Sequence, residues 1–145
     1  MPRKKKLKKN KEMSEESETL SQQLAEAVTG LIYMSETDAE ITVFEGQRTD
    51  SVTRENFLAQ IGKSDLKVEE KDFNDFFRPL TEIEDWYGED ERRMTEKFSE
   101  LKILLQQNLI DKKVFRLGKK EIDIYVVGLD GQNILRGVQT KAVET

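Results

Sequence analysis

Two groups of carboxylates are the residues of this sequence whose types and spacing could do chemistry. In the first group, Glu36, Asp38 and Glu40 alternate ahead of an apolar run. The second group surrounds Trp86-Tyr87 and consists of Glu82, Glu84, Asp85, Glu89, Asp90 and Glu91. Carboxylate oxygens bind hard cations, but neither group matches an EF-hand loop, which needs a fixed order of oxygen ligands around a central glycine. We therefore expect solvated carboxylates, and we predict no resident metal site and no cofactor.

The remaining composition argues against catalysis. The chain contains no histidine and no cysteine, so it lacks the usual general base at neutral pH, imidazole and thiolate metal ligands, and a cysteine nucleophile. The phosphate-binding loop, the dinucleotide-binding glycine motif and the nucleophile elbow are absent from the sequence as well. We expect that the protein is not an enzyme, and a carboxylate-based enzyme is the weakest of the alternatives.

Trp86 is the only tryptophan of the chain and lies among acidic residues. Tryptophans are found in protein cores more often than at contact sites. A Trp-Tyr pair ringed by carboxylates is nevertheless typical of a binding hot spot that faces a basic partner.

The net charge of −5 hides a strong asymmetry along the chain. Residues 1–12 contain seven basic residues and one acid, so the remainder has 24 − 7 = 17 basic and 29 − 1 = 28 acidic residues, a net charge of −11. Such a body repels nucleic acid and attracts basic proteins at low ionic strength. The lysine-rich arm is either a solvated tail or a nucleic-acid-binding extension, and Met13 is a possible alternative start.

Hydropathy and composition give the organisation of the chain. We predict a disordered basic or polar arm over 1–18 and one domain over 19–145, because 145 residues suit a single core. No apolar run approaches the roughly 18 residues that a membrane span needs, and no apolar stretch near the start is typical of a signal peptide. We expect a cytoplasmic protein without a membrane anchor.

The elements that position these residues follow from periodicity and capping signals. Helices are predicted from about Ser17 to Gly30, from the cap at Thr53 to Gly62, from the cap at Asp72 to Arg78-Pro79, and over about Glu89–Leu109. Thr81 and Glu84 have the spacing of a capping box. The first carboxylate group is predicted to lie in a loop.

Strands are predicted between and after these helices. The expected strands are Ile41–Phe44, ending at Glu45-Gly46, a short strand around Leu66 and Val68, a hairpin of Val114–Leu117 and Ile122–Val127, and a last strand from Val138 that runs to the final residue. The order of elements predicts an α+β fold with a mostly antiparallel sheet and helices packed on it.

Several stretches of the sequence resemble the nuclease A inhibitor family of cyanobacteria and other bacteria. They are Leu31-Ile32-Tyr33-Met34-Ser35-Glu36, Asp72-Phe73-Asn74-Asp75-Phe76-Phe77, Asp85-Trp86-Tyr87, Val114-Phe115-Arg116-Leu117-Gly118, Asp123-Ile124-Tyr125-Val126-Val127-Gly128 and Thr140-Lys141-Ala142-Val143-Glu144-Thr145. The stretches come in the order expected for the family, and the likeness as a whole covers about Leu20 to Thr145.

The resemblance implies an α/β/α sandwich that binds a Mg²⁺-dependent, DNA/RNA non-specific nuclease in a one-to-one complex. It implies that a loop glutamate and the C-terminal residue block the active site, and these roles fall on Glu36 and Thr145, which would contact the Mg²⁺ bound to the nuclease. The loop around Trp86 matches further contacts, including the position of Glu84.

The sequence also departs from the family pattern. Glu84 stands where a neutral amide is expected, Phe44 where a tryptophan is frequent, and the segment before the first strand is shorter than usual. Two alternative functions stay open: an acidic binding module for another basic protein, and a nucleic-acid-associated protein that uses the arm 1–12.

Overall fold

A central antiparallel sheet organises the chain. The computed structural model describes residues 19–63 and 67–145. The sheet has the strand order β3-β7-β6-β5-β4. Its strands are β3 (Thr42–Arg48), β4 (Val68–Lys71), β5 (Ile110–Leu117), β6 (Glu121–Leu129) and β7 (Ile134–Val143). The three C-terminal strands are consecutive in sequence and form the middle of the sheet, whereas β3 and β4 form its edges.

Glycine allows the tightest approaches in this meander. Gly118 turns the chain from β5 to β6 with a φ of 113°, a conformation that side chains rarely adopt. Gly137 lies where β7 passes β6, and a Cβ built there would come within 1.8 Å of the Val126 carbonyl oxygen. The two central strands are therefore paired at a separation that only glycine permits.

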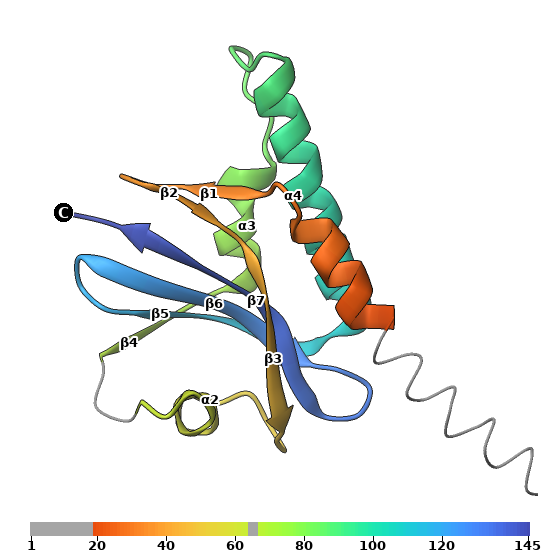
Figure 1. Cartoon of the computed structure of the whole chain (residues 1–145), viewed down its shortest axis with the longest axis vertical. Coiled ribbons are helices and arrows are strands. Elements are labelled where there is room, and N and C mark those ends of the chain that lie inside the picture. The colour runs from red at the N-terminus through yellow and green to blue at the C-terminus, as the bar shows by residue number, and fades with distance from the viewer. Residues whose placement is uncertain (1–18, 64–66) are drawn as a thin grey trace, which may run out of the picture.

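Three helices cover one face of the sheet (Figure 1). They are the N-terminal helix, whose described part is 19–28, α3 (Phe73–Thr81) and α4 (Glu89–Asn108). Phe76, Phe77, Phe98 and Leu101 are at most 5% exposed and belong to the larger of two hydrophobic clusters. Burial of these side chains supplies the main driving force for this layer.

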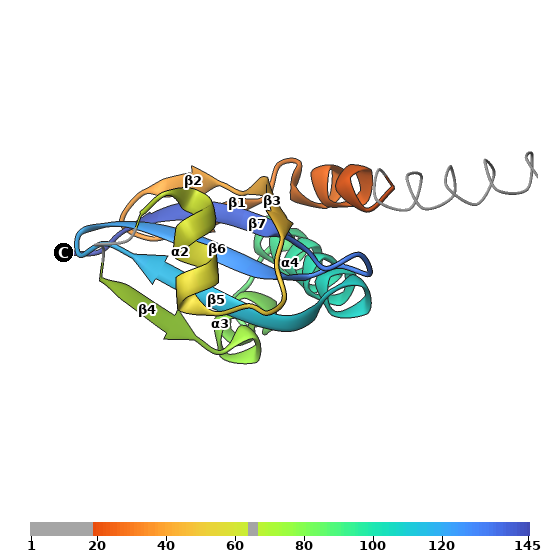
Figure 2. The same ribbon diagram turned by 90° about the horizontal axis from the view of Figure 1, so that it is seen from below.

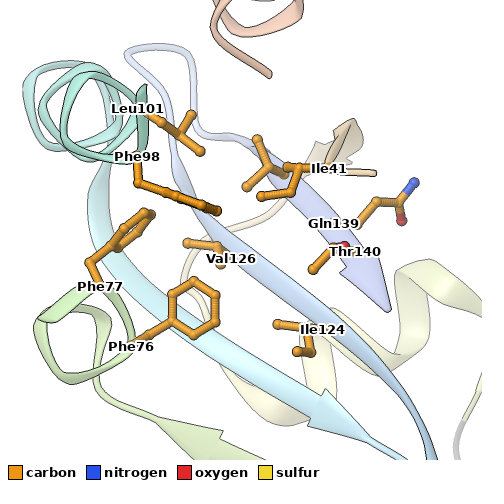
Figure 3. A pocket seen from close by; sticks show the side chains of 10 residues that line it. Ile41, Phe76, Phe77, Phe98, Leu101, Ile124, Val126, Gln139 and Thr140 are labelled. Atoms are coloured by element: carbon orange, nitrogen blue, oxygen red, sulfur yellow. The ribbon is translucent and has the colours of Figure 1, made fainter. Parts of the chain in front are cut away.

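Figure 3 shows how tightly this first layer packs. Phe76 and Phe77 of α3 and Phe98 and Leu101 of α4 point toward Val126 and the neighbouring strands. The gap that remains between them is about 10 Å³, no more than the space needed for one water molecule. It is a packing gap between mainly apolar side chains, and it offers no room for a ligand.

A single helix covers the opposite face. Helix α2 (Arg54–Ile61) crosses the sheet on the side facing the viewer in Figure 2. Its Phe57 is 1% exposed and stacks on Phe115 at a centroid distance of 4.6 Å, with Tyr125 edge-on at 4.9 Å. The second hydrophobic cluster is centred on these rings. The fold is thus α+β, with helices on both faces of an antiparallel sheet, as predicted.

A small hairpin leads into the sheet. Strands β1 (Ile32–Met34) and β2 (Asp38–Glu40) pair with each other. The hydroxyl of Thr140 on β7 donates to the Glu40 carbonyl at 3.0 Å, which fixes the base of the hairpin against β7. Figure 1 shows the hairpin on the same side of the molecule as the C-terminus.

The start and stop signals predicted from the sequence are confirmed at most helices. Thr53 and Asp72 cap α2 and α3 by accepting from the backbone N–H of Asn56 and Asp75, and Gly62 ends α2 with a φ of 71°. The predicted long helix and the C-terminal hairpin are also confirmed. Leu66 and the predicted arm over 1–18 lie outside the described residues.

The break predicted at Glu45-Gly46 is wrong, because β3 continues to Arg48. Gln60 of α2 bonds the backbone of Gln47 on both sides, with its Oε1 2.8 Å from the amide nitrogen and its Nε2 3.0 Å from the carbonyl oxygen. A Cβ at Gly46 would lie 2.4 Å from Gln60 Oε1. Gly46 therefore makes room for a helix side chain and does not end the strand.

Other boundaries also differ from the prediction. Helix α3 continues through Pro79 to Thr81, where the Thr81 hydroxyl donates to the Phe77 carbonyl at 2.9 Å and satisfies the last turn. Thr81 and Glu84 form no capping box, since residues 82–84 are not helical. Helix α4 instead begins after Gly88, whose N–H donates to Glu91 Oε2 at 3.2 Å.

No helix in the described ranges 19–63 and 67–145 is long and apolar enough to cross a membrane.

Candidate functional site

The loop of the β1–β2 hairpin is fixed to the end of β7 through Ser35. The hydroxyl of Ser35 donates to the Thr37 carbonyl at 3.1 Å and accepts from the Val143 N–H at 3.0 Å. The Ser35 N–H also donates to the Thr37 carbonyl, at 2.9 Å. One side chain therefore closes the tight loop around Glu36 and fixes that loop to the last strand.

Glu36 and Thr145 lie together beside this serine. The Glu36 N–H donates to the Val143 carbonyl at 3.3 Å, and Glu36 Oε1 accepts from the Thr145 hydroxyl at 2.7 Å. Both residues are exposed. Two residues that are 109 positions apart in the sequence thus form one acidic point, which we call the acidic tip (Glu36 and Thr145).

The last strand ends two residues earlier than predicted. Strand β7 ends at Val143 and does not run to the final residue. Beyond it, the Glu144 N–H donates to the Lys120 carbonyl at 2.9 Å, and the Glu144 carboxylate pairs with Arg116. The end of the chain is held by hydrogen bonds and an ion pair instead of strand pairing.

The first carboxylate group is arranged differently from the prediction as well. Asp38 and Glu40 lie on β2 and only Glu36 lies in a loop. Among residues 19–63 and 67–145, no three carboxylates come together in a way that could hold a metal ion. Glu36 lies in the loop of the hairpin, outside the strand pairing, and its N–H bonds the Val143 carbonyl at the end of β7.

Tyr33 connects the acidic tip to the core. Its ring stacks on Phe76 with a centroid distance of 5.8 Å and an interplanar angle of 10°. Burial raises the pKa of its hydroxyl above the ordinary value of 10.0, and the nearby Arg116 guanidinium offsets only part of that rise. Like any tyrosine, Tyr33 is neutral at pH 7 and adds no negative charge to the tip, and its raised pKa keeps it neutral to a more alkaline pH.

Trp86 and Glu84 lie on a second structure, the loop of residues 82–88 between α3 and α4. The Trp86 side chain is 73% exposed and meets Tyr87 edge-on at a centroid distance of 4.6 Å. Glu84 is exposed too, and its carbonyl accepts from the Tyr87 N–H at 3.1 Å. Figure 1 shows this loop at the far end of α4, beyond the hairpin. The structure thus brings Glu36 and Thr145 into contact and leaves Trp86 and Glu84 on a separate projection.

Both parts of the site carry exposed apolar side chains. Met34, beside the acidic tip, is 70% exposed, and Ile83, near Trp86, is 58% exposed. Large apolar groups on projecting loops lose unfavourable contact with water when a partner covers them. The arrangement suits contact with another macromolecule, with carboxylates available to cations or guanidinium groups of that partner.

A family model described as nuclease A inhibitor-like protein matches residues 18–145. The chain belongs to this family. The match spans every described helix and strand, and it includes both the acidic tip and the loop 82–88. A comparison with curated proteins finds no match.

Sequence reasoning missed several residues that hold the site of this family member in place. Arg116, Ser35, Tyr33 and Glu144 support the acidic tip. Each lies in a stretch that resembles the family, but none is predicted from the sequence to act in the site. Arg116 offered a signal, since it is the only charged residue within the apolar stretch Val114–Leu117. A charge flanked by buried positions on both sides of a strand indicates a specific partner.

Proposed function

We propose that this protein inhibits a sugar-non-specific, Mg²⁺-dependent DNA/RNA endonuclease by occupying its active site in a one-to-one complex. The observation that carries the proposal is the acidic tip, where the exposed Glu36 carboxylate lies within hydrogen-bond distance of the Thr145 hydroxyl. Membership of the nuclease A inhibitor-like family supports the choice of partner.

The chemistry of the tip fits such an active site. A nuclease that cuts phosphodiesters with Mg²⁺ keeps open positions on the ion and places cationic side chains around the phosphate. The Glu36 carboxylate and the terminal carboxylate of Thr145 are hard, anionic oxygen ligands. They would occupy the place of the scissile phosphate, contacting the nuclease-bound Mg²⁺ and its arginines. The inhibitor itself would need no cofactor and would catalyse nothing.

The loop 82–88 would supply a second contact. Trp86 is large, rigid and exposed, which are the properties of residues that dominate binding energy at interfaces. Glu84 would pair with a basic group of the nuclease next to Trp86. Two separate projections that bind together hold a partner in one orientation, and this explains how a small tip could block a cleft without being displaced by substrate.

The test is titration of plasmid and RNA degradation by a purified non-specific nuclease at saturating Mg²⁺. Stoichiometric loss of both activities is expected, and excess Mg²⁺ excludes chelation as the cause. We expect Glu36→Gln to raise the inhibition constant about 30-fold or more, since a hot-spot residue contributes about 2 kcal/mol. The glutamine retains an oxygen that can accept from Thr145, so the shape of the tip is preserved.

Matched variants separate the site from general charge effects. Glu100→Gln removes the same charge from an exposed position in the middle of α4 and should inhibit like the wild type. Trp86→Ala should weaken inhibition about tenfold or more without changing thermal stability, because the side chain is exposed. Equal inhibition by the wild type and Glu36→Gln would refute the role of the tip.

Failure of the wild type to inhibit any nuclease tested would instead favour an acidic module that binds another basic protein. The net charge of −11 outside residues 1–12 is the observation behind that second candidate.

A further inference from the structure

We infer that Arg116 is a positioning residue that orients both residues of the acidic tip, Glu36 and Thr145. The inference rests on the proposed function. Arg116 lies on β5, outside the two segments that form the tip. Its guanidinium pairs with the carboxylate of Glu144, which directly precedes Thr145. The same guanidinium lies near the hydroxyl of Tyr33, on the strand that leads to Glu36. Arg116 therefore pairs with the segment that ends in Thr145 and lies beside the segment that leads to Glu36.

The burial of the pair shows which partner is fixed. The side chain of Arg116 is 12% exposed, whereas that of Glu144 is 50% exposed. Arginine has a planar, rigid group of donors that can serve two acceptors at once. Arg116 is thus held against the sheet, and it orients the more mobile carboxylate of Glu144. Because Glu144 is half exposed, water screens the attraction, and the pair adds little to global stability.

The end of the chain has few other restraints. After β7 ends at Val143, the Glu144 N–H bonds the Lys120 carbonyl, and the Thr145 hydroxyl bonds Glu36. Terminal residues fray unless they are tied down. Loss of the ion pair would leave Thr145 held only by its hydrogen bond to Glu36 and by the bond from the Glu144 N–H to the Lys120 carbonyl. A tip that must be ordered during binding binds more weakly than one that is already ordered.

The inference predicts an effect on dissociation more than on association. Preorganised contacts act mainly on the lifetime of a complex, whereas overall charge acts mainly on the encounter rate. We expect Arg116→Gln and Glu144→Gln each to raise koff about tenfold. The double variant should resemble either single variant, since both changes remove the same contact. Arg116→Lys keeps the positive charge, so its koff should lie between that of the wild type and that of Arg116→Gln.

The experiment has two readouts on the full chain. In the free protein, amide hydrogen exchange followed by NMR should become about tenfold faster at Glu144 and Glu36 in Arg116→Gln. With a non-specific Mg²⁺-dependent nuclease immobilised as the probe, koff should rise in parallel. Arg54→Gln is the matched control, because Arg54 is an exposed arginine at the start of α2, on the opposite face of the sheet.

The outcomes distinguish the inference from the function it rests on. Unchanged exchange at Glu144 in both Arg116→Gln and Glu144→Gln would overturn the inference, even if the wild type inhibits strongly. Faster exchange with an unchanged koff would also overturn it, because the tip would then bind without being prepositioned. Absence of any nuclease binding by the wild type would refute the proposed function and the positioning role together. If Arg116→Gln loses its fold, Glu144→Gln alone decides, since its exposed carboxylate can be replaced without disturbing the core.

Discussion

At the scale of single residues, Tyr33 shows how burial controls the charge of the candidate site. Its ring stacks on Phe76, and its hydroxyl feels both charges of the pair Arg116–Glu144. Burial disfavours the phenolate, so the pKa of Tyr33 is raised above 10.0. A residue whose pKa is higher in the folded state contributes stability that is complete below its ordinary pKa. That contribution is lost as the pH rises above 10 and through the folded-state value.

We therefore expect alkaline pH to destabilise the wild type more than Tyr33→Phe. The measurement is Tm from about pH 8 to about pH 11.5 for both proteins, together with absorbance of the phenolate. The variant should lose one late-titrating tyrosine and show a shallower fall in Tm. Tyr125, whose pKa is also raised by burial, should keep titrating late in this variant. If Tm fell in parallel with rising pH for both proteins, the pKa of Tyr33 would not be raised in the folded state.

The residues of the site could be anticipated only in part. Resemblance to the family gave Glu36, Glu84 and Thr145 their predicted roles, whereas Trp86 was also a hot-spot candidate from its acidic surroundings, and the nuclease contacts of all four remain predictions. The role of Ser35 could not be found in this way, because it depends on a contact across the fold, and the charge of Arg116 within an apolar strand indicated only that it has some partner. Ser35 bonds Val143, 108 residues away. No pattern of local spacing encodes such a contact, which exists only once the hairpin lies against β7.

At the scale of elements, the central sheet depends on a close approach at Gly137. The Cβ of any other residue would lie 1.8 Å from the Val126 carbonyl oxygen, which is backbone and cannot move aside. We expect Gly137→Ala to lower the free energy of unfolding by about 2 kcal/mol or more, as overpacking in a core does. Urea denaturation would measure the loss.

Gly131 supplies the control for this substitution. It lies in the turn between β6 and β7, and a Cβ added there meets nothing within 4 Å. Gly131→Ala should stay within about 0.5 kcal/mol of the wild type. If both substitutions changed the free energy of unfolding equally, the close contact at Gly137 would not matter. The effect would then come only from the conformational entropy of the unfolded chain.

The elements themselves were predictable wherever the signal was local. Thr53, Asp72 and Gly62 mark helix ends by hydrogen bonds or by a backbone conformation that belongs to the residue itself. The hairpin strands β1 and β2 are three residues each, too short to show a periodic pattern. Gly46 was misread because its neighbour Gln60 comes from another element. Sequence reasoning failed where a distant partner determined the local structure.

At the scale of the whole molecule, the two hydrophobic clusters hold the two projections on a rigid frame. The larger cluster joins α3 and α4 to the sheet, and the smaller one joins α2 to its other face. The β1–β2 hairpin and the loop 82–88 both lie on the side of the sheet that carries α3 and α4 (Figure 1), and Tyr33 of the hairpin stacks on Phe76 of α3. A partner that contacts both would bind two projections that rest on the same packed layer.

The charge of the molecule predicts how such a partner is found. The residues after the first twelve carry a net charge of −11, against −5 for the full chain. Attraction between an acidic body and a basic nuclease cleft raises the association rate at low salt, and ions screen it over about 8–10 Å near physiological strength. We expect kon to fall about tenfold or more between about 20 mM and about 500 mM NaCl, with little change in koff. Removal of residues 1–12 should raise kon at low salt and steepen its salt dependence, because the opposing positive charge is gone. A fall in kon on removing these residues would contradict that expectation and assign the lysine-rich arm a direct part in binding.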